Sequence, residues 1–108
     1  MDTVANYHRI MTPYVAASRK QARSMVKELG ISPGDIVEIN ARNTCTVSGS
    51  FTDELIIALM EEKAGSVLVR GTVPGMLTGI KDSAALNRAE FTVEAIAFAQ
   101  RPETKYLR

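Results

Sequence analysis

The sequence predicts a small α/β domain in which helices pack on a mixed sheet. Segments rich in β-branched residues alternate with segments of helical apolar spacing, in the order β-α-β-α-β-α-β. Glycine, proline and serine turns separate these segments. The chain has 108 residues, which suffices for one hydrophobic core and is too short for two. We therefore expect a single domain over residues 1–108, with loose ends at 1–6 and 101–108.

The composition indicates which partners and which cellular compartment to expect. Thirteen basic and twelve acidic residues leave a net charge of +1, so charge gives no reason to expect a nucleic acid or membrane partner. Cys45 is the single cysteine, so an intrachain disulfide is impossible and a reducing compartment is indicated. The longest apolar run, residues 55–60, is far too short to span a membrane, and the N-terminus has no secretory h-region. We predict a cytoplasmic protein.

The first strand and the first helix follow from local signals. Residues 7–15 predict an edge strand or an extended segment, because Pro13 lacks the N–H that a central strand would need. Ser18 followed by Gln21 three residues later predicts a capping box that opens a helix, and Gly30 predicts its end. The apolar stripe of this helix comprises Ala22, Met25, Val26 and Leu29.

A basic ridge lies on the same helix. Arg19, Arg23 and Lys27 recur at intervals of four residues and should therefore stack on one side. We interpret this ridge as a solvated face rather than a binding surface.

The central segments follow a turn at residues 32–35, where proline presets φ and glycine accepts a positive φ. Residues 36–41 predict a mostly buried strand. Ser50 is the expected N-cap of the next helix, and Asp53 would complete a second capping box. The negative charge of Asp53 would also be stabilised by the positive end of the helix dipole. The predicted buried face of this helix comprises Phe51, Leu55, Ile56, Leu59 and Met60, and Gly65 should end it.

The last third of the chain predicts a strand at residues 66–72, a turn at 73–75 and a helix at 76–89. Gly79 weakens that helix and predicts a break near residues 81–83. Residues 91–98 predict a final strand, and their alanines leave a helix as the alternative.

The chain lacks the constellations that catalysis requires. It has no glycine-rich phosphate loop, and His8 is the only histidine, so no metal-ligand set can be assembled by spacing. A catalytic pair of His8 with Cys45 is geometrically open, but a buried thiol and a surface imidazole are expected instead. Asp53 and Glu54 are neighbours on a helix and point about 100° apart, so they do not form a carboxylate pair. We expect no enzyme, no cofactor and no metal.

Two motifs carry a resemblance to a known family. The segment SGSFTDELI at residues 48–56 and the helix start SRKQAR at residues 18–23 occur in the right order, about thirty residues apart. Together they resemble the signatures of STAS-like domains of unknown function, over roughly residues 15–88. That family is related to the STAS domains of bacterial anti-sigma factor antagonists.

The resemblance implies a function and a set of residues. It implies a non-enzymatic signalling module that binds a regulatory protein, such as a histidine-kinase-like ATPase or an anti-sigma-like factor. The implied contact region is residues 43–53 with the facing loop 73–75, and a serine at the helix start is the implied phosphorylation switch. On the family's Asp-Ser-Ser-Gly motif Gly49 takes the acceptor position, so Ser50 is the candidate phosphoacceptor. The residues for partner binding or switching are Ser48, Gly49, Ser50, Phe51 and Asp53.

Two other function classes remain open at this point. A nucleic-acid-associated transcriptional module would use the basic ridge, since the turn at residues 32–35 also occurs in small DNA-binding barrels. A small-anion or nucleotide-binding domain would use residues 44–50 as a cradle at the helix N-terminus.

Overall fold

A computed structural model describes residues 5–71 and 75–96 of the chain. Predictions at residues 1–4, 72–74 and 97–108 lie outside this part. The elements are β1 (Tyr7–Met11), β2 (Val15–Ala16), α1 (Arg19–Lys27), β3 (Ile36–Asn40), β4 (Thr46–Val47), α2 (Gly49–Glu61), β5 (Ser66–Arg70), α3 (Met76–Leu86) and β6 (Thr92–Ile96).

The main sheet has the order β1-β3-β5-β6, and every pairing between these strands is parallel. The predicted alternation of strands and helices is therefore confirmed, but the prediction of a mixed sheet is wrong. Each successive strand is reached through a helix, and such a crossover returns the chain to the same end of the sheet. Strand β1 lies at an edge of the described sheet, as Pro13 predicted.

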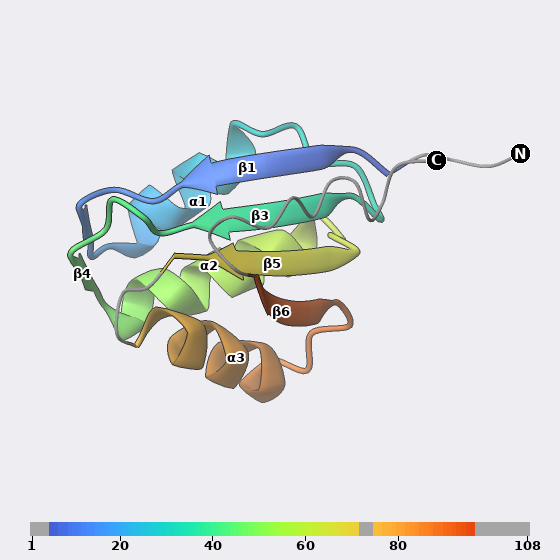
Figure 1. The fold of residues 1–108 in the computed structure, drawn as a ribbon. Helices are drawn as coiled ribbons and strands as arrows, with labels where there is room; N and C mark the ends of the chain where they lie inside the picture. Colours follow the sequence, from blue (N-terminus) through green and yellow to red (C-terminus); the bar gives the residue numbers. More distant parts are fainter. Residues whose placement is uncertain (1–4, 72–74, 97–108) are drawn as a thin grey trace, which may run out of the picture.

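The three helices pack on one face of this sheet (Figure 1). The strands are added in chain order across the sheet, so right-handed crossovers all place their helices on the same side. The core between the layers is apolar. It includes Val37, Ile39, Val67 and Val69 from the central strands and Phe51, Leu55, Ile56, Leu59 and Ile80 from α2 and α3.

The opposite face of the sheet is buried at its centre, whereas Arg9 of β1 and Glu94 of β6 are exposed on it. Ile36, Leu68 and Ile96 form a second, smaller apolar cluster there, with Tyr7 packed against it. All five residues of β3 are buried, as expected of a central parallel strand.

Local signals predicted the start of α1 and the turn before β3. The amide of Gln21 donates to Ser18 Oγ at 3.1 Å, and Gln21 Oε1 accepts from the amide of Ser18 at 2.9 Å, so the capping box is confirmed. The amide of Asp35 donates to the carbonyl of Ser32 at 3.0 Å and closes the turn.

Helix α3 runs without a break, contrary to the expectation at residues 81–83. Gly79 serves close packing instead: a Cβ there would lie 3.0 Å from Thr52 Oγ1 of α2. Glycine therefore lets α3 approach α2. The segment after α3 forms strand β6, so the strand prediction holds over residues 92–96 and the helix alternative is wrong there.

A short parallel pair, β2 with β4, was not predicted. Val15 pairs with Thr46 and Ala16 with Val47, beyond the carboxyl ends of β1 and β3. This pair places residues 14–17 beside residues 45–48. Within residues 5–71 and 75–96, no helix has the length and apolar character needed to cross a membrane.

Candidate functional site

The candidate site lies at the carboxyl edge of the parallel strands. Strand β3 ends there, and the chain passes through β4 into the start of α2. In open parallel sheets, loops at this edge are the usual place for binding, because the crossovers leave them at the surface. The predicted contact region at residues 43–53 occupies this edge.

Ser48, and not Ser50, caps helix α2. Ser48 Oγ accepts a hydrogen bond from the amide of Phe51 at 3.1 Å and donates one to the carbonyl of Ala17 at 2.7 Å. The prediction of Ser50 as N-cap is therefore wrong. The physical reason is the carbonyl of Ala17, which gives the Ser48 hydroxyl a second partner and ties the start of α2 to the start of α1.

The other residues of the predicted loop differ in accessibility. Gly49 and Ser50 are exposed in the first turn of α2, and the Ser50 hydroxyl has no hydrogen bond among the described residues. Phe51 is 0% exposed and belongs to the core. The Phe51 side chain thus anchors the start of α2 in the core. Ser50 is the serine at this edge whose hydroxyl a partner can reach.

Asp53 joins the three helices instead of completing a capping box. It is the fifth residue of α2, so the predicted second capping box is wrong, and the first turn of α2 holds no acidic residue. Ser83 Oγ donates to Asp53 Oδ1 at 2.6 Å, Asn87 Nδ2 donates to the same oxygen at 3.2 Å, and Arg19 approaches Oδ2 at 3.0 Å. These contacts, that of Ser83 foremost, hold the pKa of Asp53 below its ordinary value.

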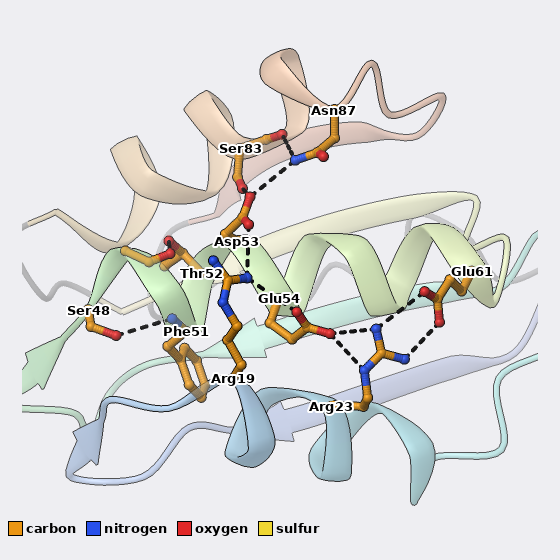
Figure 2. A network of polar contacts seen from close by, with 11 residues as sticks. Arg19, Arg23, Ser48, Phe51, Thr52, Asp53, Glu54, Glu61, Ser83 and Asn87 are labelled. Carbon is orange, nitrogen blue, oxygen red and sulfur yellow. Dashed lines mark hydrogen bonds and ion pairs between the residues drawn. The ribbon is translucent and has the colours of Figure 1, made fainter.

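The predicted basic ridge of α1 is solvent-accessible, as expected, with the Arg19 and Arg23 side chains 52% and 42% exposed, and these two arginines also form an ion-pair ladder with α2 that was not predicted. Arg19 lies 3.2 Å from Glu54, and Arg23 bridges Glu54 at 2.7 Å and Glu61 at 2.7 Å (Figure 2). The ladder neutralises the two arginines that a nucleic-acid surface would have used. Lys27 lies exposed at the end of the helix.

Two exposed apolar residues adjoin the loop, and the sequence did not indicate them. The amides of Cys45 and Thr46 donate to the carbonyl of Tyr14 at 2.7 and 3.2 Å, so Tyr14 and Val15 lie directly beside β4. Tyr14 is 68% exposed and Val15 50% exposed. A strand pattern cannot reveal such exposure, because tyrosine and valine are ordinary strand residues. We call the contact surface the exposed set Tyr14, Val15, Cys45, Thr46, Gly49 and Ser50.

A hollow of about 490 Å³ adjoins this contact surface between the end of β1 and α1. Its walls include Met11, Pro13, Ser18 and Met25. Methionine is unbranched and adaptable, so such walls suit an apolar side chain presented by a partner.

His8 and Cys45 do not come together. His8 Nε2 lies 2.8 Å from Asp35 Oδ2 near the amino end of β1, whereas Cys45 lies beyond the carboxyl end of β3. Cys45 is exposed and His8 is half-buried in a contact with Asp35, so the expected buried thiol and surface imidazole are both wrong. Burial would raise the pKa of Asp35, but the hydrogen bonds it accepts, that from His8 foremost, lower it. The described ranges contain no group of three or more histidine, cysteine or acidic residues able to hold a metal ion.

A buried carboxylate lies on the face of the sheet opposite the three described helices. Glu38 is 0% exposed and accepts hydrogen bonds from the Tyr7 hydroxyl, from Arg9 at 3.0 Å and from Arg70 at 3.1 Å. Burial would raise the pKa of Glu38, but these donors lower it. These partners come from β1 and β5, the two neighbours of β3. Glu38 therefore has a structural role, because it links three adjacent strands through buried hydrogen bonds and ion pairs.

Comparisons of the chain with protein-family models, with curated proteins and with solved structures find no match.

Proposed function

We propose that this chain is a STAS-like, non-enzymatic interaction module that binds a regulatory protein through the contact surface. The observation that carries the proposal is the β2–β4 pairing, which joins exposed Tyr14 and Val15 to the exposed start of α2. Tyrosine is enriched among the residues that dominate binding at protein interfaces, so Tyr14 is the expected anchor and Val15 adds apolar area beside it. The adjacent hollow lined by Met11 and Met25 would receive an apolar side chain of the partner.

The two serines of the loop have separate roles in this proposal. Ser48 is committed to capping α2, and its hydroxyl has both an acceptor and a donor role there. Ser50 is exposed on the first turn, where a phosphoryl group would add roughly −1.5 to −2 charge. Because the negative groups nearest in sequence, Asp53 and Glu54, are paired with Arg19, that added charge would face the partner.

The resemblance of residues 18–23 and 48–56 to STAS-like domains supports a partner of the kinase-like ATPase or anti-sigma type. It also supports Ser50 as the residue that such a partner modifies.

Affinity purification from source cells, with quantitative mass spectrometry, tests the proposal. We compare the wild type with Tyr14→Ser and Ser50→Asp, and use Leu86→Ser as the matched control because Leu86 is 84% exposed on α3. A protein retained by the wild type and Leu86→Ser, and lost at least tenfold with Tyr14→Ser and Ser50→Asp, is expected. Equal recovery with all four proteins would refute the contact surface.

A second arm tests the switch. The purified partner is incubated with the wild type and ATP, and phosphopeptides are mapped. Modification at Ser50 and not at Ser48 is expected, since only the Ser50 hydroxyl is accessible without breaking a helix cap.

A further inference from the structure

A second hollow, of about 430 Å³, lies at the opposite end of the sheet, where α2 and α3 end. Its walls comprise Met60, Lys63, Ala64, Arg88, Glu90 and Phe91. Its volume lies in the range of small-molecule sites in proteins. It shares no residue with the contact surface defined above.

Lys63 and Arg88 occupy equivalent positions in two copies of one backbone motif. Each is the first residue after a helix C-cap, and their φ angles are 60° and 55°. The amide of Lys63 donates to the carbonyl of Met60 at 3.0 Å, and that of Arg88 to the carbonyl of Ala85 at 3.2 Å. The amide that follows each of them donates back to the first carbonyl of the motif, which completes a Schellman motif at both helix ends.

This left-handed position normally holds glycine, because a side chain there strains the backbone. After α1 the left-handed residue is a glycine: Gly30, the second residue after the C-cap Glu28, has φ 66°. A Cβ at Gly30 would meet no atom within 4 Å, so conformation alone accounts for that glycine. At the ends of α2 and α3 the chain instead keeps a strained basic residue, and both of these residues line the same hollow.

The side chains around the hollow are unneutralised within the fold. In the part of the chain that the structure describes, the side chains of Lys63, Arg88 and Glu90 have no hydrogen bond or ion pair. Two positive groups and one negative group therefore surround the hollow. Below them, Phe91 is buried and Met60 is half-buried, which gives the hollow an apolar floor.

We propose that this hollow binds a small organic anion. A carboxylate or phosphate head group lies between Lys63 and Arg88, whose guanidinium offers the forked donors that such groups accept. The apolar body of the ligand packs on Met60 and Phe91, and Glu90 accepts a hydrogen bond from a hydroxyl or amine of the ligand. The competing explanation is that a basic residue stabilises the negative end of each helix, without any ligand.

Amide chemical-shift titration of the full chain with phenyl phosphate, benzoate and benzyl alcohol tests this proposal. Saturable shifts centred on Lys63, Ala64, Arg88 and Phe91 are expected with the anions and not with the alcohol. Tighter binding of either anion supports the site and identifies its head group. Shifts that are absent from these residues, or equal with the alcohol, overturn the proposal.

Glycine variants separate the proposal from the competing explanation. Lys63→Gly and Arg88→Gly should each weaken anion binding about tenfold, the usual effect of losing one charged hydrogen bond, while the melting temperature stays equal or rises. Lys81→Gln removes an equal charge from the exposed part of α3 and should leave binding unchanged. Glycine variants that bind as tightly as the wild type would overturn the proposal.

Discussion

The two ends of helix α2 use their side chains in opposite ways. At the amino end, Ser48 satisfies the amide of Phe51 and the carbonyl of Ala17 in a relaxed extended conformation. At the carboxyl end, Lys63 occupies a left-handed conformation that glycine would adopt without strain. The difference teaches that the amino end is built for stability, whereas Lys63 is retained at some cost to stability.

The largest expected effect lies beneath the amino end. Phe51→Ala should lower the free energy of unfolding by about 3–5 kcal/mol, because it empties a fully buried site between α2 and the sheet. Urea unfolding measures this loss. The exposed neighbour provides the control: Ser50→Ala should change stability by less than about 0.5 kcal/mol. A loss below about 1 kcal/mol for Phe51→Ala would contradict the packing described here.

A smaller loss should follow removal of the cap. Ser48→Ala should cost about 1–2 kcal/mol, since the amide of Phe51 and the carbonyl of Ala17 both lose a partner. Ser48→Asp keeps an acceptor for the amide of Phe51 but has no donor for the carbonyl of Ala17. Its unfolding midpoint in urea should therefore lie between those of the wild type and Ser48→Ala. If Ser50→Ala proved more destabilising than Ser48→Ala, the assignment of the cap would be wrong.

Acid should weaken the amino half of α2 through Asp53. Its pKa is lowered in the fold by Ser83, Arg19 and Asn87, so its contribution is fully present above the unfolded pKa of about 3.9. The contribution is lost as the pH falls through the lower, folded pKa. The wild type should therefore lose more stability than Asp53→Asn between about pH 5 and pH 2, measured by urea unfolding at each pH. Parallel pH profiles of the two proteins would contradict this role for Asp53.

The smallest effect, and the one of opposite sign, is expected at the carboxyl end. Lys63→Gly should raise the free energy of unfolding by roughly 0.5–1 kcal/mol. Relief of the left-handed strain, about 1–2 kcal/mol, exceeds the extra backbone entropy that glycine loses on folding. Lys63→Ala keeps the strain and is the control in the same urea series. Destabilisation by Lys63→Gly would mean that the lysine stabilises the helix end. The claim that the two ends of α2 differ in this respect would then be wrong.

Local chemistry was predictable, and long-range choices were not. The Ser18 and Gln21 box depends on residues three apart, so its pattern is visible in the sequence. The choice of Ser48 over Ser50 depends on the carbonyl of Ala17, which is 31 residues away. The exposure of Tyr14 likewise depends on a pairing with residues 45 and 46 that has no local signal.

The charged ridge shows the same limit. Its spacing on α1 was correctly predicted, but Glu54 and Glu61 come from a helix more than thirty residues later. Whether exposed arginines also pair with a neighbouring helix is decided by packing, which spacing within one helix cannot indicate. Strand direction is different, because the predicted alternation of strands and helices already favours a parallel sheet, and the expectation of a mixed sheet did not follow from it.

Site-specific photo-crosslinking in source cells tests the contact surface most directly. A photoreactive residue is placed at position 14, at position 50 or at the control position 86, all exposed in the fold. We expect positions 14 and 50 to crosslink the same protein and position 86 not to crosslink it. Crosslinking of that protein from position 86 alone, or of unrelated proteins from positions 14 and 50, would contradict a single contact surface at the start of α2.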